Sequence, residues 1–305
     1  MSDCEESEPS ELSSTPNQSS APLQMWYVPM DQLQGYCHAT KASTDPLLLS
    51  NQFEWLLEPY SRLDFKLWYS RGVWRARFCP SIGFLKFEDM SHPPPDRTIA
   101  GRLNEAGEPI LYGSLHNRIA LREIDAKAGD YVQVVEYRID PTLRLRSCVF
   151  GEFLTVHRTG RSWVDDELAK RLNHILNQLP PDAGTSVLYL DAFMSEILRD
   201  TNAAATEYLH SRTLTSRLFE KYPEVDAVLY PSVVIDGGKN LAIRPAVAKK
   251  VLSVASSAVL RITRSYEYGL FDFEVLWYAT PPWTGDTFDW KLPPADFKWP
   301  SDGHN

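Results

Sequence analysis

The apolar residues between Asp45 and Pro59 repeat with the spacing of an amphipathic helix. Asp45 supplies an N-cap, Pro46 suits the first helical position, and Pro59 marks the end. A second helical piece is predicted for residues 63–70, so residues 25–71 are expected to form a helical preface docked on the main domain. The residues of the first helix expected to face a core are Leu47, Leu48, Phe53, Leu56 and Leu57.

The segment GVWRARF at residues 72–78 alternates in side-chain character, which predicts a strand. Arg75 and Arg77 fall on one face of this strand, and Trp74 and Ala76 on the other. Two arginines on a strand face are most often surface residues, but these two precede a segment suited to an anion, so a phosphate-binding role is weighed equally. Further strands are predicted at residues 110–112, 131–137, 143–150, 225–232, 258–265 and 270–278.

Helical spacing recurs from Trp163 to Leu179, where Pro180 and Pro181 end the run. Shorter helices are predicted at residues 117–123, with Asn117 as cap, and at 187–199, 213–220 and 247–254. Helices and strands alternate imperfectly, and several strands follow one another late in the chain. This order favours an α+β fold over a doubly wound parallel sheet.

The two ends of the chain differ from its middle. Residues 1–24 are rich in Ser, Pro and Glu and almost free of apolar residues, which predicts a disordered acidic tail. A solvated leader is preferred there over an interaction tail. Residues 72–280 are expected to form the main domain, and residues 281–305, rich in Trp and Pro, an arm lying on it.

Composition narrows the class of protein. A net charge of −9 argues against a nucleic-acid binder, which needs a basic face. The four cysteines form no C-x-x-C pair and the histidines show no ligand spacing, so neither a metal site nor a disulfide framework is predicted. With no signal-peptide pattern and no membrane-spanning apolar run, a cytoplasmic protein is expected, although secretion without a cleaved signal stays open. Neither a Rossmann fingerprint nor a P-loop is present.

Candidate chemistry lies between residues 97 and 123. Arg102 occupies a Gly-Arg-Leu-Asn turn, Tyr112 ends a short apolar run, and Glu123 follows on the predicted helix. A fixed cation, an aromatic face and a carboxylate are the groups needed to hold an anionic dinucleotide and attack its glycosidic bond. Each also has an ordinary interpretation: a loop arginine paired with Glu105, a core tyrosine and a helix-surface glutamate.

These residues belong to a larger pattern: WRAR at 74–77, PPPDRTIAGRLNEAGEPILYGS at 93–114, ALRE at 120–123, LYPSVV at 229–234 and GGKNLAI at 237–243. In order and spacing they resemble the RES domain, a family of NAD-degrading toxins, over about residues 72–252. The resemblance implies a split mixed sheet similar to that of the ADP-ribosyltransferases. It also implies cleavage of NAD at the nicotinamide–ribose bond and a partner antitoxin with a helix-turn-helix domain.

On this resemblance the essential Arg, Tyr, Glu and Ser of the family fall on Arg102, Tyr112, Glu123 and Ser232. Arg102 would bind the diphosphate, with help from the arginines of the first strand; Tyr112 would pack on the nicotinamide or its ribose, and Ser232 would aim a hydroxyl at substrate. Glu123 would stabilise the sugar cation. Asn240, in a predicted glycine-rich turn, could contact substrate, but a turn role is preferred.

NAD is then a substrate, and no cofactor is predicted. The acceptor of the ADP-ribose could be water, phosphate or a protein. An NAD glycohydrolase or phosphorylase acting as a toxin is therefore the first hypothesis, and a protein-modifying ADP-ribosyltransferase the second. A non-catalytic interaction protein that retains the fold ranks last, because the Arg, Tyr and Glu are all present.

Overall fold

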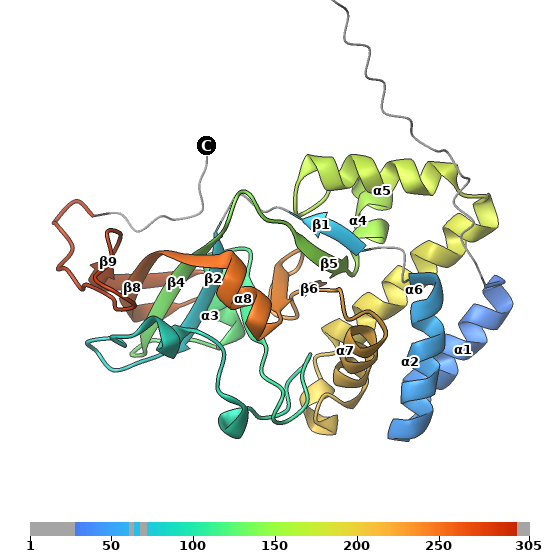
Figure 1. Cartoon of the computed structure of the whole chain (residues 1–305), viewed down its shortest axis with the longest axis horizontal. Helices are drawn as coiled ribbons and strands as arrows, with labels where there is room; N and C mark the ends of the chain where they lie inside the picture. Colours follow the sequence, from blue (N-terminus) through green and yellow to red (C-terminus); the bar gives the residue numbers. More distant parts are fainter. Residues whose placement is uncertain (1–27, 61–63, 68–71, 298–305) are drawn as a thin grey trace, which may run out of the picture.

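The computed structural model of the chain describes residues 28–60, 64–67 and 72–297, with only the backbone for residues 59–60 and 64–67. In this part of the chain a mixed sheet of nine strands is packed against helices (Figure 1). The predicted tail at residues 1–24 lies outside the described residues. The mixed sheet with separate helical layers confirms the α+β class.

The sheet has the strand order β1-β5-β6-β7-β3-β2-β4-β8-β9. Its pairs are antiparallel except β5 with β6, which are parallel. The strands are β1 (Asp64–Leu67), β2 (Val73–Phe78), β3 (Leu111–Ser114), β4 (Tyr131–Ile139), β5 (Leu145–Val149), β6 (Ala227–Pro231), β7 (Lys239–Ile243), β8 (Leu252–Ser265) and β9 (Phe271–Ala279).

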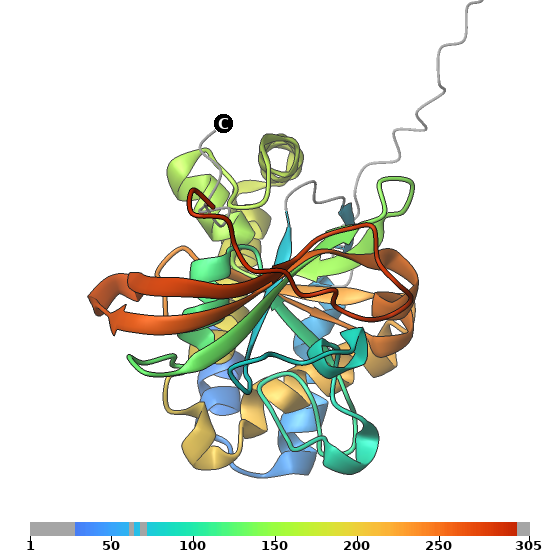
Figure 2. The ribbon, with the colours of Figure 1, turned by 90° about the vertical axis from the view of Figure 1, so that its left-hand side faces the viewer.

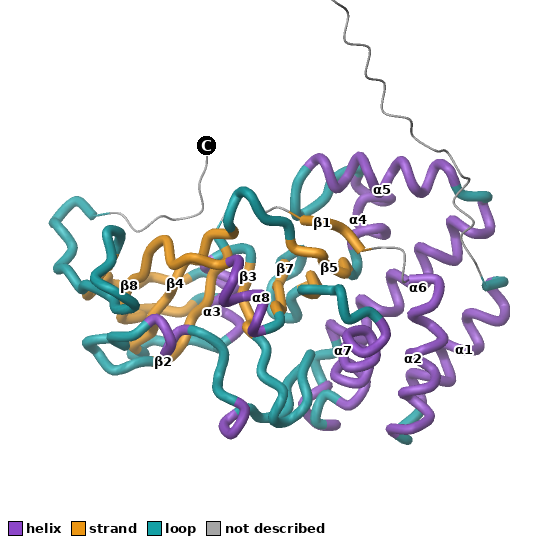
Figure 3. Tube along the Cα trace, viewed as in Figure 1, coloured by secondary structure: helices purple, strands orange, loops and turns teal. Residues whose placement is uncertain are grey.

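The helices gather mainly at the end of the molecule opposite β8 and β9 (Figure 3), and Figure 2 looks onto the end formed by those two strands. The α-helices are α1 (Met30–Ala42), α2 (Pro46–Tyr60), α3 (Asn117–Glu123), α4 (Glu152–Thr159), α5 (Asp166–Gln178), α6 (Pro181–Arg199), α7 (Leu209–Lys221) and α8 (Pro245–Val251). Short 3₁₀ turns are η1 (Phe87–Met90), η2 (Pro95–Arg97), η3 (Ala203–Thr206) and η4 (Glu267–Gly269).

Helices α1 and α2 pack on α6 and α7. In α2 the buried stripe runs through Leu49, Phe53, Leu56 and Leu57, each fully inaccessible to solvent. These positions follow the spacing i, i+4, i+7 and i+8 of one helix face. The prediction that Leu47 and Leu48 face the core is wrong, because both lie off that stripe and are exposed.

The second helical piece predicted at residues 63–70 is also wrong where the structure describes it. Residues 64–67 form β1, which pairs with β5 at the edge of the sheet. The rest of that span, residue 63 and residues 68–70, lies outside the described residues. A neighbouring strand with free backbone groups therefore decides the conformation of a segment whose side chains alone suited a helix.

The sheet narrows to one point between β2 and β3. Among the paired residues of the described strands, only Trp74 and Ser114 join these two. Beyond that point the Arg75 guanidinium spans the opening, with Nη1 donating to the carbonyl of Tyr112 at 2.8 Å. Burial lowers the pKa of Arg75 to about 10. Tyr137 acts to raise this pKa, and the positive charge of Arg77 acts to lower it. A side chain thus replaces the missing ladder hydrogen bond at the split.

The largest difference from the sequence-based expectation is β7. Residues 236–240 are predicted as a turn, but Lys239 and Asn240 begin a strand that lies between β3 and β6. All five residues of β7 are buried. Lys239 is tolerated there because its Nζ is 2.7 Å from Oε1 of Glu152, which begins α4 and is itself fully buried.

Helix α4 and the central strand β7 are therefore tied by an ion pair whose side chains are 4% and 0% exposed. Replacing Glu152 by Gln leaves the Lys239 ammonium buried without its counter-charge, so the free energy of unfolding should fall by about 3–5 kcal/mol. Urea denaturation measures this change. The double variant Glu152→Leu with Lys239→Met removes both charges and should recover much of the loss; recovery of none would show that the pair does not act as a unit.

Candidate active site

Helix α3 places Glu123 over the central strands of the sheet. Ala120 and Leu121 are buried against Trp74 and Ala76 of β2, which fixes the helix on that face. Glu123 is its last residue and is exposed. The N-cap residue is His116, and Asn117, the predicted cap, is the first helical residue. A carboxylate in the last turn faces the negative end of the helix dipole, so it needs donors from elsewhere.

Two side chains supply those donors to one oxygen of Glu123. Oε1 accepts a hydrogen bond from Nδ2 of Asn240 at 2.6 Å and from Oγ of Ser232 at 2.7 Å. For Oε2 no hydrogen bond or ion pair is recorded within the described part of the chain. The carboxylate is thus held through one oxygen, and its other oxygen is open. Asn240 was expected from the sequence to serve mainly in a turn, but in the structure its side chain holds Glu123.

The amide of Asn240 is fixed at both ends. Its Oδ1 accepts from Oγ of Ser114 at 2.7 Å while its Nδ2 donates to Glu123. Ser114 and Asn240 are direct partners across β3 and β7, and Asn240 is also the direct partner of Tyr230 across β6 and β7. Paired residues point to the same face of a sheet, so the ladder Ser114–Asn240–Tyr230 crosses three strands below Glu123.

Ser232 directly follows β6 and is 1% exposed. Its Oγ donates to Glu123 and accepts from the backbone N–H groups of Val234 and Ile235 at 3.2 and 3.3 Å. The backbone N–H of Ser232 donates to the carbonyl of Gly238 at 2.8 Å, which closes the loop of residues 232–238. Because its proton and lone pairs are engaged, Ser232 orients Glu123 and is not placed as a nucleophile.

Tyr112 and Arg102 form a second wall of the candidate site, built around the turn at residues 101–104. The Tyr112 hydroxyl donates to Oδ1 of Asn104 at 2.7 Å and accepts from the N–H of Leu103 at 2.9 Å, which holds the turn at residues 101–104. Burial is the main cause that raises the pKa of Tyr112 far above its ordinary value. The tyrosine therefore stays a neutral phenol and shapes the turn that carries Arg102.

Arg102 is anchored at the end of α6. Its Nη1 donates to the carbonyls of Leu198 and Asp200, each at 3.0 Å, where the helix carbonyls lack partners of their own. The guanidinium also lies 5.4 Å from the ring centre of Tyr208. The ordinary partner considered for Arg102, Glu105, instead pairs with Arg212 at 3.4 Å.

Tyr230 is influenced by groups from both parts of the site. Its pKa is raised well above the ordinary value, first by burial and then by the charge of Glu123 and by Tyr112, while Arg102 acts in the opposite sense. The phenol is therefore within electrostatic reach of all three predicted residues. Tyr230 was not predicted from the sequence. It lies two residues before Ser232 in the predicted strand, and residues with that spacing point to the same face of a sheet.

The two arginines of β2 have other contacts. Arg75 bonds the Tyr112 backbone at the split. Nη1 of Arg77 donates to the Asp89 carbonyl, and its guanidinium lies 5.6 Å from the ring centre of Phe84. No recorded contact joins either arginine to Glu123, Ser232 or Asn240. Their predicted role as substrate-binding residues has no support in these contacts, which stabilise β2 and its neighbours.

A comparison with protein-family models gives one decisive result. The model of the RES domain matches residues 73–265, more than half of the chain. The chain belongs to the RES domain family. Within this RES domain lie Ser232 and Asn240, which hold Glu123, and also Arg102 and Tyr112. No curated protein and no solved structure matches the chain.

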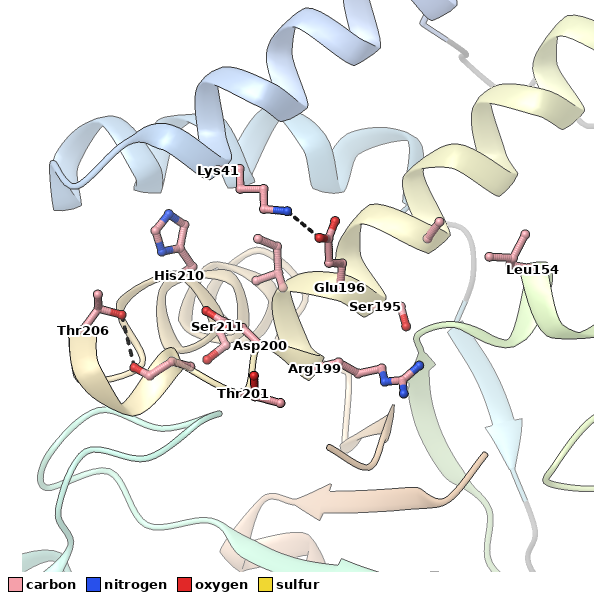
Figure 4. Close-up of a pocket in the computed structure, with 13 residues that line it drawn as sticks. Lys41, Leu154, Ser195, Glu196, Arg199, Asp200, Thr201, Thr206, His210 and Ser211 are labelled. Carbon is pink, nitrogen blue, oxygen red and sulfur yellow. Dashed lines mark hydrogen bonds and ion pairs between the residues drawn. The ribbon is translucent and has the colours of Figure 1, made fainter. Parts of the chain in front are cut away.

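A cavity of about 570 Å³ adjoins the RES site on the side of the helices (Figure 4). It touches the site at two points: Asp200, whose carbonyl accepts from Arg102, and Arg199, which pairs with Asp236 of the 232–238 loop at 3.2 Å. Other lining residues include Lys41, Ser195, Glu196 and His210. The cavity therefore borders both walls without including Glu123.

Membrane-spanning helices and metal-binding clusters are both absent from the residues that the structure describes. No helix there is long and apolar enough to cross a lipid bilayer. No group of three or more His, Cys, Asp or Glu side chains is arranged to hold a metal ion in that part of the chain.

The 232–238 loop depends on Gly237, which has φ +76° and packs against the indole of Trp163. Gly237→Ala should destabilise the protein by about 1–2 kcal/mol for the left-handed backbone and by about 1–3 kcal/mol more for the overlap with the indole. Gly160→Ala is the matched control, because φ there is +70° with nothing within 4 Å of the added Cβ. Thermal unfolding should rank Gly237→Ala below Gly160→Ala; equal losses would contradict the packing argument.

Proposed function

We propose that this RES domain cleaves NAD at the nicotinamide–ribose bond and passes the ADP-ribose to water or phosphate. The observation that carries the proposal is the Glu123 carboxylate, held through Oε1 by Ser232 and Asn240 and open at Oε2. A carboxylate fixed in this way presents its oxygen at a defined place. The family to which the chain belongs supports the same reading.

The proposed reaction breaks the bond between the anomeric carbon and the pyridinium nitrogen of NAD. The electron pair of that bond goes to the nitrogen, so nicotinamide leaves neutral and needs no general acid. Positive charge builds on the ribose, and the open side of Glu123 stabilises it or receives the proton of the attacking water. The oxygen of water or phosphate then bonds to the anomeric carbon.

Arg102 is proposed to bind the diphosphate. Its Nη1 is committed to the carbonyls that follow α6, while no contact is recorded within the described residues for its Nε or Nη2. Guanidinium groups bind phosphate oxygens through charge-assisted hydrogen bonds, and an anchored one loses little freedom on binding. Tyr112, on the same wall, is proposed to pack its ring against the nicotinamide half.

The sheet that narrows between β2 and β3 supports a likeness to the ADP-ribosyltransferases, whose sheets are also split. A toxin role and a partner antitoxin with a helix-turn-helix domain are proposed from the family alone. ADP-ribosylation of a protein would use the same site and differ only in the acceptor.

Glu123→Gln tests the central claim. The amide keeps the shape but loses the charge that stabilises the ribose cation, so turnover of NAD should fall by at least about 100-fold. Free nicotinamide is measured by chromatography after incubation of the purified protein with NAD, with and without phosphate. Undiminished turnover in the variant would remove Glu123 from the reaction.

Glu167→Gln is the matched control, because Glu167 is also an exposed helical glutamate, in the first turn of α5. It should leave turnover unchanged. Nicotinamide release in the absence of any added protein rules out an obligatory protein acceptor. Release only after addition of a protein would favour the transferase instead.

Arg102→Ala should weaken NAD binding by about 1.5–3 kcal/mol, the worth of hydrogen bonds to a charged group. It should also lower the unfolding temperature, because the carbonyls of Leu198 and Asp200 lose their donor. Calorimetric titration with NAD and a thermal scan measure the two effects. Arg217→Ala is the control, because Arg217 pairs only with nearby Glu220 in the recorded contacts; a matching loss of affinity there would show that the effect is not local to the site.

A further inference from the structure

Tyr230 is a nearly buried residue whose hydroxyl makes no hydrogen bond to the described part of the chain. The residue is 5% exposed. The other buried phenols nearby are satisfied: Tyr112 bonds Asn104, and Tyr137 donates to the carbonyl of Met90 at 2.9 Å. The Tyr230 hydroxyl is not among the fully inaccessible polar atoms that lack a partner in this part of the chain, so it is accessible although the rest of the residue is buried. An accessible hydroxyl with no protein partner is free to bind a ligand.

The surroundings of this hydroxyl are those of the site. Tyr230 is the cross-strand partner of Asn240, which holds Glu123. The charges and phenols that act on it are Glu123, Tyr112 and Arg102, from three different segments. Tyr230 is therefore next to the residue that holds the carboxylate, and within electrostatic reach of both that carboxylate and the cation assigned to the diphosphate.

The ionisation state decides what this group can do. Burial and the charge of Glu123 raise the pKa of Tyr230 well above its ordinary value, so the phenol keeps its proton at neutral pH. A neutral phenol can donate a hydrogen bond but cannot act as a base there. Its acceptor must be an oxygen that enters with the ligand.

We propose that Tyr230 is a substrate-binding residue that donates a hydrogen bond to a hydroxyl oxygen of the nicotinamide ribose. In NAD the ribose hydroxyls lie between the diphosphate and the glycosidic bond, and Tyr230 pairs with the strand residue that holds Glu123 while Arg102 is within electrostatic reach. This inference rests on the proposed NAD cleavage and adds a contact that fixes the sugar relative to Glu123.

Tyr230→Phe tests the inference, because it removes the hydroxyl and keeps the ring in its packing. A contact made alike to substrate and transition state should raise KM for NAD about tenfold and leave kcat nearly unchanged. Tyr137→Phe is the matched control: it loses the bond to Met90, so its Tm should fall while KM stays unchanged. Tyr230→Phe should keep the Tm of the parent protein, because no protein hydrogen bond is lost.

Analogues of NAD that lack either the 2′- or the 3′-hydroxyl of the nicotinamide ribose identify the acceptor. For one analogue, Tyr230→Phe and the parent protein should show the same KM, because the partner oxygen is already absent. If the parent protein and Tyr230→Phe both cleave NAD with the same KM, the inference is wrong but the proposed function stands. The inference is also wrong if Tyr230→Phe raises KM for both analogues as much as it raises KM for NAD.

If the parent protein cleaves no NAD, the proposed function fails separately. Calorimetric titration with NAD then decides the inference: weaker binding by Tyr230→Phe supports it, and equal or absent binding by both proteins overturns it.

Discussion

The site depends on a carboxylate that must stay charged and reachable at once. A glutamate exposed at the end of a helix is free to move, whereas one buried among apolar groups gives up its charge. Glu123 avoids both outcomes because Asn240 and Ser232 donate to one oxygen and leave the other open. This solution requires β7 to lie between β3 and β6, so that Asn240 reaches Glu123 while Ser114 fixes the amide.

The same requirement explains the buried charges behind the site. Asn240 can serve Glu123 only if its neighbour Lys239 points to the opposite side of β7 and is buried there. Glu152 accepts that ammonium and also bonds the hydroxyl of Ser162 and the N–H of Trp163. Helix α4 and the segment after it are thereby joined to the strand that carries the site, and the hydrophobic core continues from there to α6 and α2.

Much of this could be predicted from the sequence, and the limits have physical causes. The strand at 73–78 and the helix that follows Asp45 were predictable because their patterns are local. The spacing of Arg102, Tyr112, Glu123 and Ser232 identified the family, which the match to the RES domain confirms. Strand β7 was not predictable: Gly, Lys and Asn indicate a turn unless distant partners for Lys239 and Asn240 are known. Tyr230 was hidden for the same reason, since its importance comes from neighbours on other strands.

Tyr112 has a consequence for how variants of this family can be read. Its ring is proposed to pack on the substrate, but its hydroxyl braces Leu103 and Asn104 beside Arg102. The phenol and the guanidinium are thus one mechanical unit. A phenylalanine at this position would keep the aromatic ring but lose the hydroxyl that braces the turn beside the cation, so lineages that exchange the tyrosine must rebuild that turn at the same time.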